Sequence, residues 1–223
     1  GLIFGEGRPH NYITAKGCRP VDLGYNVEES LPGLVTYGII TNDEVVLSAA
    51  EKAMEAHMEF MLPDGAWDNS WGTRSNKWTY WGSRTSDGCQ IGYGLLAKRN
   101  PIFEEVVYRN TKLLQACTHD GLLYGGPMYV SAGEPPCVHH TFCHAKAIAS
   151  LLEHNIEPKG GRELPRELAQ GIKFFPSIHV ALLAKGKWRA TVSDYDFDYV
   201  EEGHATGGAI TMLWHEAAGP LIA

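Results

Sequence analysis

A change in hydrophobic periodicity constrains the fold of this chain more than any other feature. Before Pro158-Lys159-Gly160-Gly161 the apolar residues recur at the three- and four-residue spacing of helices, and after Gly171 they alternate with the two-residue period of strands. We therefore predict an α+β protein with helices in residues 1–158 and an antiparallel β part in residues 159–223. The helices are expected at 22–40, 41–63, 85–97, 101–117 and 138–152, and the strands at 178–183, 188–192, 209–215 and 221–223.

The expected helices come in pairs that end in similar loops. Asp64-Gly65 and Asp120-Gly121 lie about 56 residues apart, which is typical of an array of helical hairpins. Thr41 is expected to cap one helix, and Lys185-Gly186-Lys187 is expected to form a hairpin turn. Such an array has open ends, and the sequence stops within an expected strand, so the chain is expected to be a fragment of a longer protein.

Charge and cysteine usage exclude several classes of protein. The 223 residues carry 19 Lys and Arg against 26 Asp and Glu, a net charge of -7 that does not favour general nucleic-acid binding. No apolar run is long enough to span a membrane, and the N-terminus lacks the pattern of a signal peptide. Five cysteines without a Cys-x-x-Cys pair indicate neither a disulfide framework nor a zinc finger.

An aromatic and cationic segment at residues 67–84 suits a saccharide cleft. It holds four tryptophans that could stack on sugar rings and several cations that could meet anionic groups. Packing of the same rings onto the helical part is the open alternative. The residues assigned to substrate binding in this segment are Asn69, Trp71, Arg74, Trp78, Tyr80 and Trp81.

A histidine and cysteine cluster at residues 137–144 is the densest group of titratable side chains. His139 and Cys143, or His140 and His144, share a helix face at a spacing that zinc ligands use, but no carboxylate accompanies them. Metal binding, lining of an active site by His139 or His140, and helix packing all remain open. His179 and His215 are expected on sheet faces, and the acidic run 194–199 is either a calcium site or a solvated edge.

Two motifs resemble the heparinase II/III-type polysaccharide lyases. Asp120-Gly121-Leu122-Leu123-Tyr124-Gly125-Gly126-Pro127-Met128-Tyr129 is similar to the family loop whose last tyrosine is catalytic, and Gly203-His204-Ala205-Thr206-Gly207-Gly208 is similar to a segment of its β-sandwich. The resemblance implies part of an (α/α) toroid followed by the beginning of a β-sandwich. It also implies catalytic roles for Tyr129 and His204 and a substrate contact for Tyr124.

The chain departs from the family pattern at other positions. Thr206 and Gly208 stand where the family has ligands of a structural zinc, so no metal ligand and no cofactor is assigned, and a structural divalent metal is left open. The neutralising Asn-His pair of related lyases is missing, and Arg84 is the nearest residue that could neutralise a substrate carboxylate. An ion pair of Arg84 with Asp68 or Asp87 is the open alternative.

The resemblance predicts an enzyme that cleaves a uronate-containing polysaccharide by β-elimination. Its expected catalytic residues are Tyr129, His204, Arg84, His139 and His140. The expected partner is an acidic polysaccharide or oligosaccharide, self-association is left open, and the resemblance implies a periplasmic or secreted location. Two alternatives remain: a non-catalytic glycan-binding module, or a glycoside hydrolase whose candidate carboxylates are Asp64, Asp68, Asp87 and Asp120.

Overall fold

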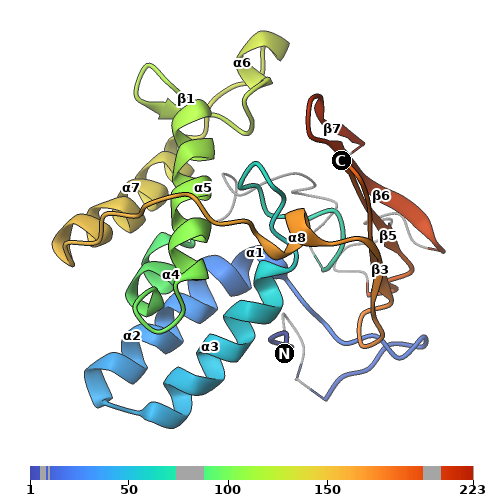
Figure 1. The fold of residues 1–223 in the computed structure, drawn as a ribbon, viewed down its shortest axis with the longest axis horizontal. Coiled ribbons are helices and arrows are strands. Elements are labelled where there is room, and N and C mark those ends of the chain that lie inside the picture. The colour runs from blue at the N-terminus through green and yellow to red at the C-terminus, as the bar shows by residue number, and fades with distance from the viewer. Residues whose placement is uncertain (6–8, 10, 74–87, 198–206, 223) are drawn as a thin grey trace.

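The computed structural model of the protein describes residues 1–5, 9, 11–73, 88–197 and 207–222. Figure 1 shows the long helices gathered on one side of the molecule and the large sheet on the other. The described helices lie between Leu23 and Leu168, and the sheet lies between Gly171 and Ile222. The chain is therefore an α+β protein, and the change from helix to strand follows the change in periodicity.

The helices pack in contacting pairs. Helix α2 lies against α3 and α4 lies against α5, while α4 also contacts both α2 and α7. None of the described helices is both long and apolar enough to cross a bilayer. The elements are α1 Leu23–Tyr25, a π-helical turn Asn26–Ser30, α2 Leu31–Thr41, α3 Glu44–Met58, α4 Gln90–Leu96, α5 Ile102–Ala116, α6 Tyr129–Ala132, α7 Val138–Glu153 and α8 Pro165–Leu168.

The turn between α2 and α3 differs from the prediction. Thr41 is the last residue of α2 and caps nothing downstream, so the capping assignment is wrong. Asn42 adopts the left-handed conformation with φ 56°, which asparagine tolerates at a helix end. The Asp43 carboxylate then accepts hydrogen bonds from the backbone N–H groups of Val45 and Val46, at 3.0 and 3.1 Å, and caps α3.

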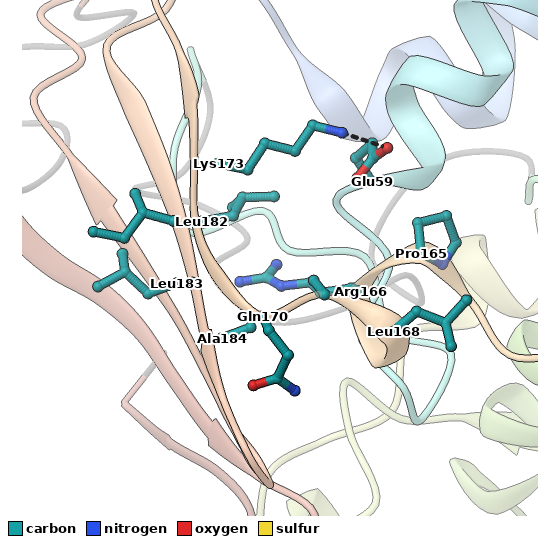
Figure 2. Close-up of a pocket in the computed structure, with 12 residues that line it drawn as sticks. Glu59, Pro165, Arg166, Leu168, Gln170, Lys173, Leu182, Leu183 and Ala184 are labelled. Carbon is teal, nitrogen blue, oxygen red and sulfur yellow. Dashed lines mark ion pairs between the residues drawn. The ribbon is translucent and has the colours of Figure 1, made fainter.

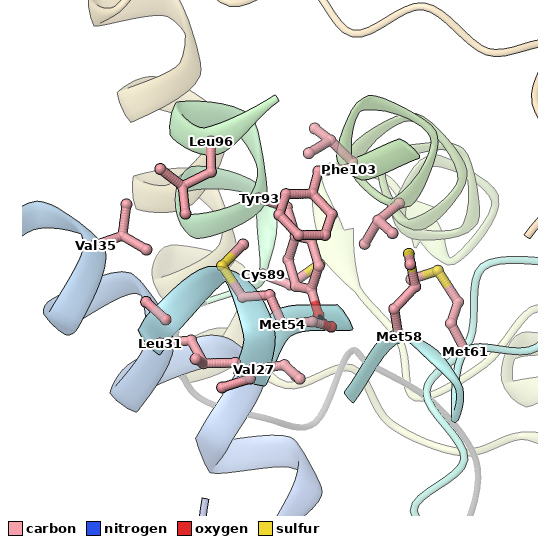
Figure 3. Packing of buried hydrophobic residues seen from close by; sticks show 14 of the residues in the cluster. Val27, Leu31, Val35, Met54, Met58, Met61, Cys89, Tyr93, Leu96 and Phe103 are labelled. Atoms are coloured by element: carbon pink, nitrogen blue, oxygen red, sulfur yellow. Dashed lines mark hydrogen bonds between the residues drawn. The ribbon is translucent and has the colours of Figure 1, made fainter. Parts of the chain in front are cut away.

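The main hydrophobic core lies between the helices, as Figure 3 shows. Tyr93 is fully buried there; its ring meets that of Phe103 edge-on at 5.1 Å, and its hydroxyl donates a hydrogen bond to the Met54 carbonyl at 2.9 Å. The buried phenol therefore has its polar atom satisfied. Other members of this core are Val27, Leu31, Val35, Met58, Met61, Trp67, Cys89, Leu96, Val106 and Val107.

A buried histidine forms part of the same interior. His57 has no exposed surface; its Nδ1 lies 2.7 Å from the Ala53 carbonyl, and its Nε2 lies 3.1 Å from Asn26 Nδ2. Since a carbonyl only accepts, Nδ1 carries the proton, and Nε2 accepts from the Asn26 amide. This arrangement fits the neutral ring, and burial lowers the pKa of His57 to about 4 although the hydrogen bond to Ala53 opposes the shift.

We expect the free energy of unfolding to decrease as the pH falls from about 6.5 to about 4, because His57 is protonated more readily in the unfolded chain. The lowered pKa corresponds to a loss of about 3 kcal/mol over this range. Urea unfolding at a series of pH values measures it. His57→Gln removes this titration while the carboxylates still titrate, so its stability should depend less on pH; parallel curves for the two proteins would contradict the assignment.

All five strands of the sheet pair antiparallel in chain order, β3-β4-β5-β6-β7. The predicted hairpin turn is confirmed, since Lys185 pairs with Trp188 and Gly186 has a positive φ of 52°. His179 precedes β4 in a turn with φ 50°, so its assignment to a strand is wrong. The strands are β3 Gly171–Phe175, β4 Val180–Lys185, β5 Trp188–Ser193, β6 Ala209–His215 and β7 Gly219–Ile222.

The described acids of the run 194–199 hold the N-terminal segment. Asp196 accepts hydrogen bonds from the Thr14 hydroxyl and from the backbone N–H of Lys16, and Asp194 forms an ion pair with the Lys16 ammonium at 2.6 Å. Burial works against ionisation of Asp196, yet these hydrogen bonds hold its pKa below the usual value. Both carboxylates thus contact the N-terminal segment, although the Asp194 side chain is still 41% exposed, and Asp198 lies outside the described residues.

A second buried cluster joins the N-terminal segment, the end of α3 and the inner face of the sheet. Tyr195 sits in this cluster, where its hydroxyl accepts from the Val21 N–H and donates to the Arg19 carbonyl, both at 3.0 Å. Residues from both parts of the chain therefore share one core. Its members are Cys18, Val21, Leu23, Phe60, Trp71, Ile178, Val180, Leu182, Tyr195 and Phe197.

Candidate functional site

A short hairpin carries the predicted catalytic loop. Strands β1 Thr118–His119 and β2 Leu122–Leu123 pair antiparallel and are joined by Asp120 and Gly121. Both turn residues have positive φ, 50° and 76°, which is the requirement of a type I′ turn and the reason that Asp-Gly suits it. The Asp-Gly step thus specifies a hairpin that directs the chain into residues 124–129.

The Tyr129 ring lies over two glycines of this loop. A Cβ atom built on Gly125 would come within 2.0 Å of Tyr129 Cε2, and one on Gly126 would lie 3.4 Å from Cδ1. The loop therefore has room for the half-buried tyrosine ring only because residue 125 has no side chain.

Helix α7 is fastened to the same hairpin. The Leu123 carbonyl accepts from the Cys137 N–H, and the Leu123 N–H donates to the Thr141 hydroxyl, both at 2.9 Å. These two bonds place the first turn of α7, which carries His139 and His140, beside the strand that leads into the tyrosine loop. The structure thus brings together the two sequence motifs that hold Tyr129 and the histidines.

The side chains of the histidine and cysteine cluster pair with each other along α7. Cys137 Sγ lies 2.6 Å from His140 Nδ1, and Cys143 Sγ lies 3.6 Å from His139 Nε2. His144 Nδ1 lies 2.9 Å from the His140 carbonyl, so this nitrogen donates. The sequence spacing had suggested the pair of His139 and Cys143. The pair of Cys137 and His140 is an additional contact, which its spacing of three residues along a helix could have indicated.

Gly88, four residues beyond the aromatic segment, lies against α7. Gly88 is buried, and a Cβ atom there would lie 3.1 Å from Ala147 Cβ and 3.3 Å from His144 Cδ2. The chain therefore re-enters the described structure one helical turn beyond His140. Tyr124, in the loop that leads to Tyr129, is half-buried, and its ring meets that of His119 edge-on with the centroids 5.5 Å apart.

The other end of the aromatic segment lies in the core. Trp71 is 1% exposed and packs between Phe60, at 4.6 Å, and Tyr195, at 6.0 Å between ring centroids. Asn69 is 6% exposed. Neither side chain offers a free face to a polymer in this structure, because residues 66–73 are buried between the helices and the sheet. Trp71 and Asn69 therefore lie in the packed interior, which is the alternative that the sequence analysis left open for this segment.

Six of the predicted site residues lie outside the described part of the chain. They are two of the expected catalytic residues and four of the expected substrate contacts: Arg84, His204, Arg74, Trp78, Tyr80 and Trp81.

A buried ion pair links the aromatic segment to the sheet. Arg166 of α8, 2% exposed, donates to the Asp68 carboxylate at 2.6 Å and to the Thr191 hydroxyl at 2.6 Å. Asp68 in turn accepts from the Thr191 hydroxyl and from the Ser70 hydroxyl, the latter at 2.6 Å. The sequence did not reveal this network, because its members are far apart along the chain.

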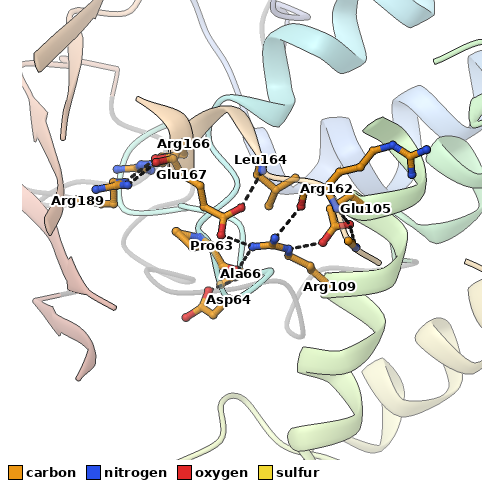
Figure 4. A network of polar contacts seen from close by, with 11 residues as sticks. Pro63, Asp64, Ala66, Glu105, Arg109, Arg162, Leu164, Arg166, Glu167 and Arg189 are labelled. Atoms are coloured by element: carbon orange, nitrogen blue, oxygen red, sulfur yellow. Dashed lines mark hydrogen bonds and ion pairs between the residues drawn. The ribbon is translucent and has the colours of Figure 1, made fainter. Parts of the chain in front are cut away.

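A second arginine clamps α5 to α8, as Figure 4 shows. Arg109 contacts the carboxylates of Glu105 at 2.5 Å and Glu167 at 2.8 Å, and it donates to the carbonyls of Pro63 and Arg162 at 2.6 and 2.8 Å. The two arginine networks fix the Asp64-Gly65 loop, α8 and the sheet relative to the helices.

A hollow of about 350 Å³ lies between α8 and the edge of the sheet, as Figure 2 shows. An ion pair between Lys173 and Glu59, 2.6 Å apart, lies at one side, and the Arg166 side chain extends between the walls. None of the described site residues predicted from the sequence lines this hollow. The lining residues also include Pro165, Leu168, Gln170, Ile172, Leu182, Leu183 and Ala184.

The described carboxylates proposed for a hydrolase are engaged elsewhere. Asp68 is held by Arg166 and by hydroxyls, and Asp64 accepts from the Trp214 indole N–H at 2.9 Å. Asp120 lies in the exposed hairpin turn, and Asp87 lies outside the described residues. The described part of the structure therefore shows no two of these carboxylates positioned as an acid and base pair.

The structural zinc that the resemblance implies does not fit the residues at that position. Gly208 has no side chain to offer, and its N–H donates to the Ser193 carbonyl at 3.0 Å. Among the described residues, no three His, Cys, Asp or Glu side chains are grouped so that they could hold a metal ion.

Comparison with known proteins agrees with this combination of elements. The family described as Ulvan lyase N-terminal domain matches residues 1–167, and the family described as Ulvan lyase C-terminal domain matches residues 172–223. A broad-specificity ulvan lyase from Formosa agariphila is 50% identical over the whole of this chain. The chain spans 36% of the length of that relative. No solved structure matches.

The two matches meet where α8 ends and β3 begins, so the helical part carries the N-terminal family and the sheet carries the C-terminal one. The Tyr129 loop, α7 and the aromatic segment all lie within the N-terminal match. The chain therefore belongs to the ulvan lyase family.

Proposed function

We propose that this chain is part of a polysaccharide lyase that cleaves ulvan, a uronate-containing polysaccharide, by β-elimination, with Tyr129 as the proton-transfer residue. The observation that carries the proposal is the position of the Tyr129 ring, which packs on Gly125 and Gly126. The hairpin that leads into this loop is hydrogen-bonded to the end of α7 that carries the histidines. The name of the relative from Formosa agariphila agrees with this substrate.

Elimination requires removal of a weakly acidic proton beside a carboxylate. A cation or hydrogen-bond donor must neutralise that carboxylate, so that negative charge can build up as the proton leaves. The phenolate oxygen of Tyr129 then takes the proton, the electrons form a carbon–carbon double bond, and the glycosidic bond breaks. The phenol returns the proton to the departing oxygen, so the enzyme ends the cycle unchanged.

Other residues complete the proposal. In this proposal Arg84 neutralises the substrate carboxylate, His204 contacts the substrate, and His139 or His140 lines the active site. Tyr124 and the aromatic segment with Arg74, Trp78, Tyr80 and Trp81 bind the flanking sugars. The attachment of both the tyrosine loop and Gly88 to α7 supports the roles of His139 and His140.

The finer architecture also belongs to the proposal. We infer that the paired helices are part of an (α/α) toroid of the heparinase II/III type and that the sheet is one layer of a β-sandwich. Two observations support this: α2, α4 and α7 contact in succession, and the five strands are all antiparallel. A periplasmic or secreted location follows from the size of a polymeric substrate that cannot enter a cell.

We expect the protein to raise the absorbance at about 235 nm when it is incubated with ulvan, because elimination leaves a double bond conjugated to the carboxylate. Chain shortening is measured in parallel by size-exclusion chromatography. New reducing ends without the absorbance would indicate hydrolysis instead. Binding of ulvan without either change would indicate a glycan-binding module and contradict the proposal.

A further inference from the structure

A cysteine side chain contacts a histidine ring at the start of α7. Cys137 is the residue that precedes the helix, and its Sγ atom lies 2.6 Å from Nδ1 of His140. Both residues belong to one turn, so this contact depends on the local backbone and not on what surrounds the chain. Among the described residues no third side chain joins the pair to hold a metal ion, so the pair is not half of a metal site.

Cys137 occupies a position at which other residue types stabilise a helix. Ser, Thr, Asp and Asn are preferred just before the first helical residue, because their oxygen atoms accept from the backbone N–H groups of the first turn. Asp43 caps α3 in this way, whereas the Cys137 side chain makes no such bond. Its thiol contacts the ring of His140 instead. The side chain at this position therefore acts on the histidine and not on the helix end.

The backbone of both residues is held by further hydrogen bonds. The Cys137 N–H donates to the Leu123 carbonyl at 2.9 Å, and the Cys137 carbonyl accepts from the Thr141 hydroxyl at 2.7 Å. The His140 carbonyl accepts from Nδ1 of His144 at 2.9 Å. The thiol is thus a fixed partner for the imidazole ring, and the pair is attached to the hairpin that leads into the tyrosine loop.

The chemistry of this contact decides which ring nitrogen carries the proton. The sulfur of a thiol is a weak acceptor, whereas an unprotonated imidazole nitrogen accepts readily, so the S–H of Cys137 donates to Nδ1 of His140. The proton of the neutral ring then lies on Nε2. Transfer of the thiol proton to Nδ1 leaves this result unchanged, since both nitrogens of an imidazolium carry protons. In either case Nε2 is a hydrogen-bond donor.

We propose that Cys137 is a positioning residue that holds His140 with a proton on Nε2, so that His140 donates a hydrogen bond to the substrate carboxylate. Such a donor stabilises the negative charge that develops during elimination. A nitrogen that already carries a proton cannot remove one from the sugar, so the proton transfer is left to Tyr129. The role of His140 toward the substrate rests on the proposed function, whereas the position of its proton rests on the geometry of α7.

The position of the proton is tested by NMR of the protein with isotope-labelled histidines at about pH 9, where free histidine is neutral. His140→Gln removes one ring from the spectrum and thereby identifies its signals. We expect a proton on Nε2 of His140 in the unaltered protein and in Cys137→Ser, whose hydroxyl also donates. In Cys137→Asp the carboxylate only accepts, so the proton should move to Nδ1. An unprotonated Nε2 in the unaltered protein would overturn the proposal, and so would unchanged His140 signals in Cys137→Asp.

Kinetics on ulvan separate this role from a merely structural one. Cys137→Ala leaves the ring without its partner and should lower kcat about tenfold, and Cys137→Ser should restore most of the loss. Cys137→Asp is a better helix cap and should raise the thermal stability, yet it should lower kcat, a combination that a structural role does not give. The matched control is Cys143→Ala, which removes the thiol 3.6 Å from His139 and should keep kcat unchanged.

The two readouts also separate this proposal from the proposed function. Failure of the lyase proposal would appear as absence of elimination by the unaltered protein, and the NMR spectra would then still decide where the His140 proton lies. Near-normal kcat in Cys137→Ala, alongside normal elimination by the unaltered protein, would overturn the positioning role of Cys137. An equal loss of kcat in Cys143→Ala would do the same, because the effect would then not be specific to the Cys137 thiol.

Discussion

Tyr129→Phe is expected to lower kcat by about 10²–10⁴-fold on ulvan, because the substitution removes the only atom of this side chain that can carry a proton. The phenyl ring retains its place over Gly125 and Gly126. Ground-state binding should therefore change little, and KM should stay near its original value. Initial rates of absorbance increase over a range of ulvan concentrations measure both constants. Near-normal kcat in the variant would remove Tyr129 from the mechanism.

The two glycines under the Tyr129 ring provide a matched pair of variants that test whether the mechanism depends on the position of the ring. Gly125→Ala places a methyl group where Tyr129 Cε2 lies, so the ring must move, and a displacement of this kind can reduce turnover by about 10²-fold. In Gly126→Ala the new methyl group lies 3.4 Å from Tyr129 Cδ1, an ordinary van der Waals contact, so turnover should hardly change. Neither glycine has a positive φ, so the backbone tolerates alanine at both positions. Equal activity of the two variants would contradict a mechanism that depends on the ring position.

The elements that the sequence predicted well are those with a strong local signal. Periodicity predicted five helical segments and four strands, and β6 has the predicted bounds Ala209–His215. The Asp120-Gly121 step indicated a loop, and its two positive φ angles show that the same residues specify a type I′ hairpin. Strand β3 was missed because most of its residues are exposed and its alternation is short.

The predictions that needed tertiary information fared less well. Trp71 is of the residue type that stacks on sugars, but its burial depends on Phe60, just after α3, and on Tyr195, beyond β5. The pairing of Lys185 with Trp188, and of Trp188 with His215, depends on the register of three strands, which periodicity alone does not fix. Local pattern thus located the segments, whereas their partners were set by contacts between distant residues.

The pairing of Arg166 with Asp68 is the strongest example of such a distant contact. These residues are separated by 98 positions, and both are almost fully buried. Arg166 also donates to the Thr191 hydroxyl and the Ala190 carbonyl, so one guanidinium connects α8, the aromatic segment and β5. The cost of taking both charges out of water is offset only while each has its partner.

We therefore expect Arg166→Met to lower the free energy of unfolding by about 3–5 kcal/mol, because the Asp68 carboxylate would remain buried without its cation. Urea unfolding measures the change. Adding Asp68→Asn removes the unpaired charge and retains a group that can bond to Ser70 and Thr191, so the double variant should recover much of the loss. As the surface control, Arg99→Met breaks the exposed ion pairs with Glu44 and Glu51 and should have little effect. If the double variant were no more stable than Arg166→Met alone, the loss would arise from packing of the side chain, and the charge argument would fail.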